Sequence, residues 1–194
     1  IQAGVAPGDV QVIVVLDGCQ DGTAAAVEAA RCGHPWLPIT VLETPGIGAG
    51  LARREGLLAA RERHPKLLCS TDADTVVSRE WIAAQLAAVR GGAGAIAGRV
   101  ELDAVEAAAL DPEVLAARAA EGRLRLQAVR RWAPDAEHHQ FSAASLALTP
   151  DAFDAVGGLP ELAVHEDDAL EHELRARGIR IAYTRGARVT TSAR

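Results

Sequence analysis

The sequence predicts an α/β fold in which helices flank a doubly wound, mostly parallel sheet. The run Val10–Leu16 is apolar and rich in β-branched residues, as expected for a strand that is covered on both faces. Further short apolar runs alternate with helix-like segments, which is the pattern of a parallel sheet with crossover helices. Asp17, Asp72 and Asp74 each follow an apolar run, at the strand ends where ligands bind in open α/β sheets.

The first hundred residues supply most of the expected sheet. Asp21 and Thr23 are suited to cap the first helix, and the glycines of 46–50 predict a flexible turn before the second. The expected strands are 10–16, 38–42, 66–70 and 94–100, and the expected helices are 23–33, 51–63 and 78–90.

The remaining residues continue the alternation. Pro112 is well placed in the first turn of a long Ala/Arg helix, Gly157 and Gly158 close a short helix, and Gly178 stops the last one. The expected helices are 104–110, 112–132, 150–156 and 165–177, and the expected strands are 142–148, 179–183 and 187–190.

Composition narrows the class of protein. The 194 residues suffice for a single domain, 1–194, with a real core. A net charge of −6 argues against a nucleic-acid groove as the main purpose, so no nucleic-acid partner is expected. Cys19, Cys32 and Cys69 are widely spaced and fit a reducing compartment better than a zinc site or a disulfide framework. No apolar run is long enough for a transmembrane segment, and no signal peptide is visible.

The pair Asp72 and Asp74 is the most informative feature of the chain. Two neighbouring carboxylates repel each other unless a cation or hydrogen bonds compensate them. A divalent metal that carries substrate phosphates is one such compensation, because Mg²⁺ sites often use one or two carboxylates. The alternative is a loop that caps the helix expected from Ser78.

Other polar residues allow both a functional and a structural interpretation. Glu166, Asp167 and Asp168 favour a helix N-terminus electrostatically, yet so many acidic groups are excessive for capping, so we expect a catalytic base among them. Arg53 near a helix start could reach a phosphate or simply be solvated. His139, like the histidine before it, is suited either to ligate a metal or to act as a solvated or capping imidazole.

Several motifs in order make the chain resemble the family 2 glycosyltransferases, which have the GT-A fold. The segment 14–23 resembles the family's V-V-D-D-G-S-x-D-G-T, and 48–56 resembles G-x-x-x-A-R-N-x-G, with Arg53 at the family's Arg. Residues 72–74 match D-A-D. The family's V-G-G-F, E-D-x-x-L and R-G-x-R-I-x-Y resemble 156–159, 166–170 and 177–183.

The resemblance implies a metal-dependent, inverting glycosyltransferase that moves a sugar from a nucleotide-diphosphate sugar to a hydroxyl acceptor. Its nucleotide-binding half would cover about 1–100 and its acceptor-binding half about 101–194. It places Asp17, Arg53 and Asp72 on the nucleotide, Asp74 with Asp72 on a divalent cation (Mg or Mn), Asp167 as the catalytic base, and Glu166 and His139 on the acceptor side.

The resemblance leaves the acceptor and the location open. A lipid-linked acceptor is one option, and the implied location is the cytoplasm or the periphery of the inner face of a membrane. The donor sugar, its nucleotide, the oligomeric state and whether the chain is a fragment are not specified by these motifs.

The chain also departs from the family pattern. The family's first strand, which ends in P-x-x-N-E, is not found, and Leu16 replaces one of the paired aspartates. Glu173 stands where many members have Arg, and 190–192 is Thr-Thr-Ser where a metal-supporting His often stands. We therefore expect the metal to be held more weakly or to be completed by diphosphate and water. A nucleotidyltransferase, whose Gly-rich phosphate loop is not seen, and a non-catalytic sugar-nucleotide-binding domain are the alternatives.

Overall fold

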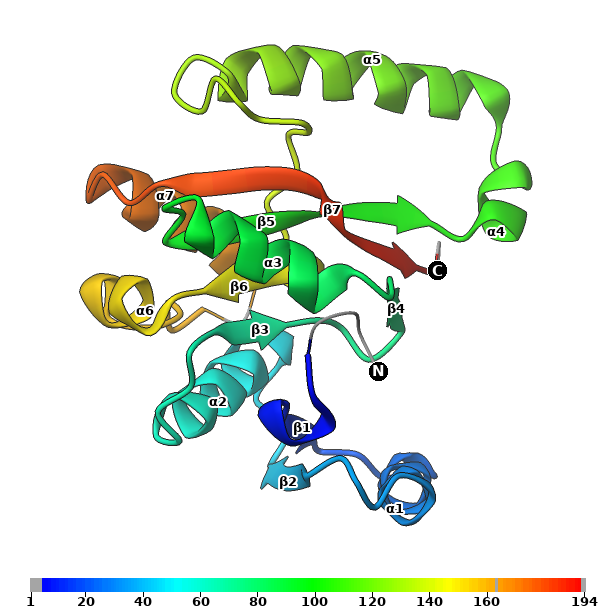
Figure 1. Cartoon of the computed structure of the whole chain (residues 1–194). Coiled ribbons are helices and arrows are strands. Elements are labelled where there is room, and N and C mark those ends of the chain that lie inside the picture. Colours follow the sequence, from blue (N-terminus) through cyan, green and yellow to red (C-terminus); the bar gives the residue numbers. More distant parts are fainter. Residues whose placement is uncertain (1–4, 163, 193–194) are drawn as a thin grey trace.

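The computed structural model describes residues 5–162 and 164–192, and its strands form two sheets (Figure 1). In the first, β1 pairs in parallel with β2; the second has the strand order β3-β6-β5-β7-β4. The long ladders β1–β2 and β5–β7 are parallel, whereas three short antiparallel ladders join β6 and β4 to their neighbours. The strands are β1 Val12–Asp17, β2 Ile39–Thr44, β3 Leu68–Ser70, β4 Thr75–Val77, β5 Ala95–Leu102, β6 Leu146–Leu148 and β7 Ile181–Thr191.

Helices flank these strands, as the alternating pattern predicts. The Asp103, Asp111 and Thr149 side chains accept hydrogen bonds from the first turns of α4, α5 and α6, which fixes where these helices begin. The helices are α1 Thr23–Gly33, α2 Ala49–Arg61, α3 Trp81–Arg90, α4 Ala104–Ala108, α5 Pro112–Val129, α6 Pro150–Val156 and α7 Glu166–Ala176, with short 3₁₀ helices η1 Pro7–Asp9 and η2 Ala143–Ser145. None of the helices in the described residues is long and apolar enough to cross a membrane.

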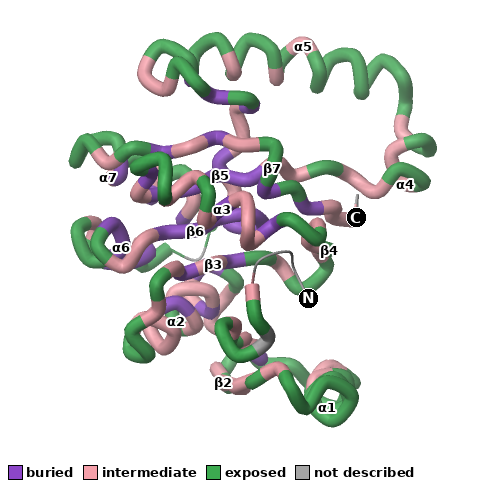
Figure 2. Tube along the Cα trace, viewed as in Figure 1, coloured by how far each residue is buried: buried purple, intermediate pink, exposed green. Residues whose placement is uncertain are grey.

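The core lies on both faces of the five-stranded sheet, because side chains alternate along each strand. On β5, Ala95 and Ala97 pack with residues of α2, α6 and α7, whereas Ile96 packs with residues of α3 on the other face. Figure 2 shows buried positions concentrated in this sheet and the helices against it. α5 runs along the outside of the molecule, and Val129 is its only buried residue.

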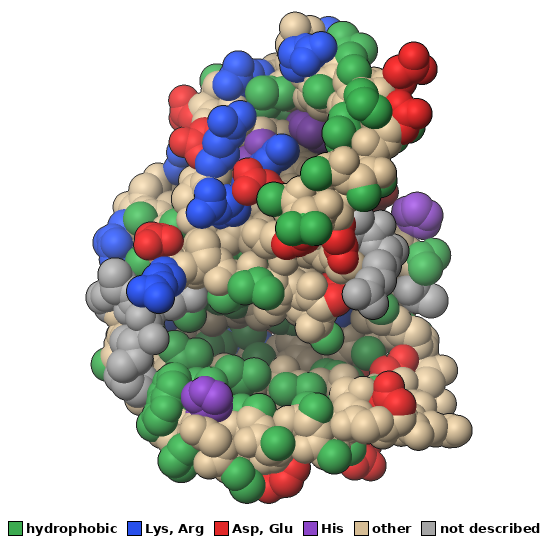
Figure 3. Space-filling view, turned by 90° about the vertical axis from the view of Figure 1, so that its right-hand side faces the viewer, with side chains coloured by type: hydrophobic (Ala, Val, Ile, Leu, Met, Phe, Trp, Pro, Cys, Tyr) green, Lys and Arg blue, Asp and Glu red, His purple; other side chains and the backbone are tan. Residues whose placement is uncertain are grey.

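The sheet does not continue from β1 to β3. Within the described residues, β1 pairs only with β2 and β3 only with β6. Of the apolar residues in β1, only Leu16 is buried, although the sequence predicts a strand covered on both faces. Figure 3 shows a hollow lined with hydrophobic side chains between the lower part of the molecule, which holds α1, β1 and β2 in Figure 1, and the part above it. The expected coverage of β1 is therefore only partly present.

Some expected elements differ in type. The segment 142–148 is not one strand, because the Ser142 side chain accepts from the Ala144 amide and folds 143–145 into η2 before β6. The two expected terminal strands are one continuous strand, β7, with an irregularity opposite Gly98 that absorbs the extra residues. β4 was not expected; its three residues pair with the end of β7.

Candidate active site

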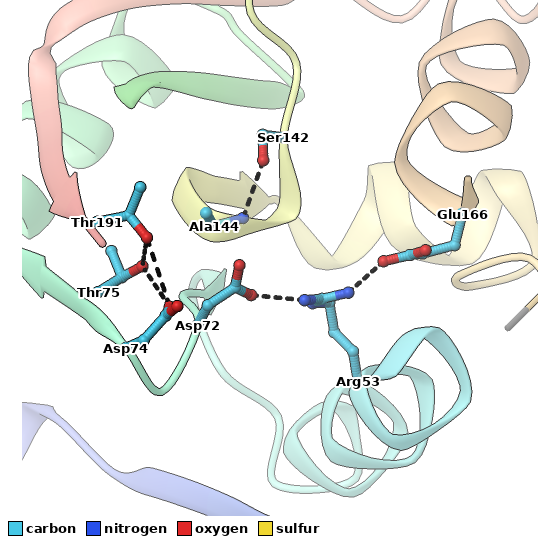
Figure 4. Close-up of polar contacts among 8 residues, drawn as sticks. All are labelled: Arg53, Asp72, Asp74, Thr75, Ser142, Ala144, Glu166 and Thr191. Carbon is cyan, nitrogen blue, oxygen red and sulfur yellow. Dashed lines mark hydrogen bonds and ion pairs between the residues drawn. The ribbon is translucent and has the colours of Figure 1, made fainter. Parts of the chain in front are cut away.

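The Asp72–Asp74 loop leaves β3 and meets the end of β7 (Figure 4). Thr75 lies opposite Thr191 in the β4–β7 ladder. The Thr75 hydroxyl donates to Asp74 Oδ1 at 3.2 Å, and the Thr191 hydroxyl lies 3.4 Å from the same oxygen. Asp74 is otherwise exposed, so two hydroxyl groups orient its carboxylate while leaving it open to solvent.

Arg53 on α2 joins this loop to the start of α7. One guanidinium nitrogen donates to Asp72 Oδ1 at 2.5 Å, and the other donates to Glu166 Oε1 in a short contact. The Arg53 side chain is 15% exposed and that of Glu166 10%, against 38% for Asp72. The structure therefore brings three of the sequence-predicted residues into one partly buried cluster of ion pairs, drawn in Figure 4.

The three acidic residues that begin α7 have different surroundings. Glu166 is buried against Arg53, Asp167 is half-buried, and Asp168 is exposed. Asp167 Oδ1 accepts from the Asp168 amide, and the Asp168 carboxylate lies 3.6 Å from the imidazole of His165. Residues on a helix diverge by about 100° per position, which accounts for these differences.

Asp17 holds the glycine-rich turn that follows β2. Its Oδ1 accepts from the Thr44 hydroxyl at 2.7 Å and from the Gly46 and Ile47 amides, and its Oδ2 accepts from the Gly48 amide at 2.8 Å. These donors hold the pKa of Asp17 below its usual value, with the Thr44 hydroxyl as the largest cause. The contacts of Asp17 thus shape the turn that leads into α2, and they do not include the Asp72–Arg53–Glu166 cluster.

Among the described residues, His138 and His139 do not gather with the carboxylates into a metal site. His138 is buried, its Nδ1 accepts from the Gln140 amide, and burial lowers its pKa to about 4. With Nδ1 as the acceptor, Nε2 carries the proton and donates to the Thr184 carbonyl at 3.2 Å. The His139 ring packs so close to Gly122 of α5 that a Cβ there would come within 2.9 Å of it.

Buried hydrogen bonds to α3 and β7 hold the loop that carries η2 in place. The Trp81 indole donates to Ser145 Oγ at 2.9 Å, and the Ser145 hydroxyl donates to the Ala187 carbonyl at 2.9 Å. A Cβ on Gly98 would lie 1.9 Å from Ser145 Oγ, so only glycine fits beneath this link. Figure 4 shows Ser142 and Ala144 of this loop above Asp72 and Asp74. Sequence reasoning missed the contact between Trp81 and Ser145, because nothing in the local pattern of either residue indicates it.

Comparison with known families decides the class. The model of the family described as "Glycosyltransferase like family 2" matches residues 2–194. The chain belongs to this family. No curated protein matches the sequence at a significant level.

Solved structures similar to this family 2-like chain are GT-A glycosyltransferases, which confirms the fold class. The mannosyltransferase PcManGT from Pyrobaculum calidifontis, in complex with GDP-Man and Mn²⁺, is 21% identical with a TM-score of 0.68, over 95% of this chain and 48% of that one. S. aureus TarS with UDP is 16% identical with a TM-score of 0.61, over 98% and 51%. GalNAc-T7 with UDP, GalNAc and Mn²⁺ is 11% identical with a TM-score of 0.63, over 96% and 38%. The chain thus spans about half or less of the proteins it matches.

The carboxylates of this glycosyltransferase-like chain suit a hard divalent cation. Asp72 and Asp74 offer oxygen ligands, which Mg²⁺ and Mn²⁺ prefer. Nowhere in 5–162 and 164–192 do three or more His, Cys, Asp or Glu side chains gather as a ready cation cage. Thr191 stands beside Asp74 where the resemblance expects a metal-supporting His, and a hydroxyl is a weaker ligand than an imidazole. The residues therefore fit a metal that depends on its substrate for further ligands.

Proposed function

We propose that the protein is a metal-dependent, inverting glycosyltransferase that uses a nucleotide-diphosphate sugar as its donor and a hydroxyl compound as its acceptor. The observation that carries this proposal is the convergence of the D-A-D loop, α2 and the start of α7 on one cluster, through Arg53, Asp72 and Glu166. Three separate family motifs supply these residues. The nucleotides and Mn²⁺ named with the similar structures support the same class of donor.

Asp72 and Asp74 are the proposed holders of the cation. When bound, a divalent cation would offset the negative charge of the leaving diphosphate. Diphosphate oxygens and water would complete its coordination, because the described residues offer only these two carboxylates at the loop. Asp17 and Arg53 border the proposed nucleotide site: Asp17 shapes the turn before α2, and Arg53 holds Asp72.

Asp167 is the proposed catalytic base. The acceptor hydroxyl oxygen attacks the anomeric carbon from the face opposite the diphosphate, and the new C–O bond inverts the configuration. The bond between the anomeric carbon and the diphosphate oxygen breaks, and its electron pair leaves with the diphosphate. The hydroxyl proton passes to the Asp167 carboxylate, which is half-buried beside the buried Glu166 and so is the more accessible of the pair.

The proposed acceptor side includes Glu166 and His139. Glu166 would help to orient the acceptor indirectly, through Arg53, because its carboxylate is buried against that guanidinium. His139 lies against α5, which would be one wall of the acceptor site. The acceptor could be free or lipid-linked, and a lipid-linked acceptor would bring the protein to the inner face of a membrane.

The experiment that tests this function measures release of the nucleoside diphosphate. The protein is incubated with Mn²⁺ and GDP-mannose or a panel of UDP-sugars, with and without simple glycoside acceptors, and the anomeric configuration of any product is read by NMR. Mn²⁺-dependent release with an inverted product supports the proposal. A retained configuration, or no release with any donor, contradicts it.

A further inference from the structure

Arg53 uses both ends of its guanidinium within the protein. One end donates to Asp72, which follows 19 residues later in the chain, and the other to Glu166, which follows 113 residues later. A planar guanidinium can hold two carboxylates in a fixed relation, which the single point charge of lysine cannot do. The contact therefore sets the start of α7 at a fixed place relative to the D-A-D loop.

The neighbouring arginine supports this interpretation. Arg54 donates to the Leu159 carbonyl at 3.1 Å and pairs with Glu161 at 2.9 Å, in the segment that precedes α7. Arg53 and Arg54 of α2 thus both bind the part of the chain around the α7 N-terminus. Both guanidinium groups already have protein partners, so neither is free to bind a ligand.

We propose that Arg53 is a positioning residue, which holds the first turn of α7, and with it Asp167, in register with Asp72. The expected effect of Arg53 on turnover rests on the proposed function, whereas its expected effect on the position of the α7 N-terminus does not. Glu166 becomes the anchor of this link. A buried carboxylate that loses its cationic partner is strongly unfavourable, so removal of Arg53 should release the α7 N-terminus.

The test compares Arg53→Met with Arg61→Met. Arg61 lies on the same helix and donates through Nε and Nη2 to the two carboxylate oxygens of Asp154 of α6, so the control removes an ion pair of the same helix away from α7. Amide hydrogen exchange of α7 is measured for both variants. Arg53→Met should raise exchange in the first two turns of α7 by about tenfold or more, as expected for loss of a charged hydrogen bond, and Arg61→Met should leave it unchanged.

A second measurement separates positioning from nucleotide contact. GDP and UDP binding in the presence of Mn²⁺ is titrated calorimetrically for the wild type and Arg53→Met. A positioning role predicts a fall in kcat that is much larger than any change in nucleotide affinity or donor KM. Arg53→Lys should restore kcat only in part, because one ammonium group cannot hold both carboxylates. Loss of nucleotide binding with wild-type exchange in α7 would overturn the inference.

The outcomes keep the two proposals distinguishable. Wild-type protein that binds neither nucleotide contradicts the proposed function, while the exchange result still decides the role of Arg53. Exchange in Arg53→Met equal to that in Arg61→Met overturns the positioning role. If Arg53→Met does not fold, Arg53→Lys carries the test, since one ammonium group cannot span both carboxylates; wild-type exchange in its α7 would refute the inference.

Discussion

The hydroxyl of Thr191, the last residue of β7, lies 3.4 Å from Asp74 Oδ1. The contact follows from the antiparallel pairing of Thr191 with Thr75, which brings the end of the closing strand to the D-A-D loop. Family resemblance expects a metal-supporting His at about this place, and the chain has Thr-Thr-Ser at 190–192. The strand end therefore lies beside the carboxylates, and it carries a hydroxyl where the resemblance expects an imidazole.

Asp167 and Asp168 provide a matched pair for the proposed base. Asp167→Asn should lower turnover by roughly 10²–10⁴-fold, the usual contribution of a positioned base, with donor affinity nearly unchanged. Asp168→Asn should have little effect, because its side chain is 75% exposed and, within the part of the chain that the structure describes, pairs with the exposed His165. Steady-state kinetics of both variants provide the measurement. If Asp168→Asn loses turnover and Asp167→Asn does not, Asp168 is the base. If both variants keep full activity, neither residue is the base.

Acid should destabilise the protein through His138. The unfolded chain binds a proton near the ordinary histidine pKa of 6.5, whereas burial holds the folded pKa at about 4. Between these values the unfolded state binds more protons, so stability falls as pH falls from about 7 to 4, by on the order of 3 kcal/mol.

Urea unfolding at several pH values measures this dependence. His138→Gln should flatten the profile across that window, although it lowers stability at pH 7 if the amide cannot reach both the Gln140 amide and the Thr184 carbonyl. The exposed His172 supplies the control, because His172→Gln should leave the profile unaltered. If the stability of His138→Gln falls with pH as steeply as that of the wild type, His138 is not the cause of the acid destabilisation.

Asp17 should be required for the turn after β2. Asp17→Ala removes the acceptor for the Gly46, Ile47 and Gly48 amides, so these amides should exchange with solvent faster than in the wild type. Asp21→Ala is the matched control, since Asp21 accepts from the amide and the hydroxyl of Thr23 at the start of α1. Unchanged exchange at 46–48 in Asp17→Ala would show that the turn holds without this carboxylate.

The sequence predicted most of the fold because its signals are local. Apolar runs, Pro112 at a helix start and Gly157 at a helix end are visible in a few consecutive residues, and the structure confirms the elements they indicate. β4 escaped prediction because its three residues become a strand only through pairing with β7. The 3₁₀ turn η2 escaped because a side-chain cap at Ser142 overrides the strand-like pattern of 142–148.

The residues of the candidate site could be selected from the sequence, but the contacts between them could not. The motifs selected Arg53, Asp72 and Glu166, which the structure joins, yet no spacing in the sequence indicates that one arginine bridges two carboxylates 94 residues apart (positions 72 and 166). Buried supports such as the Trp81–Ser145 link depend on segments that meet only in the folded chain. Long-range packing of this kind leaves no local pattern.

The central claim is that Asp72 and Asp74 hold a cation that binds the donor diphosphate, and metal-dependent nucleotide binding tests it most directly. GDP and UDP are titrated calorimetrically into wild-type protein and Asp74→Ala, each in Mn²⁺ and in EDTA. Because Asp74 is exposed and outside the core, its variant should keep the wild-type circular dichroism and melting temperature. The account predicts binding only for the wild type in Mn²⁺. Equal binding in EDTA, or undiminished binding by Asp74→Ala, would contradict it.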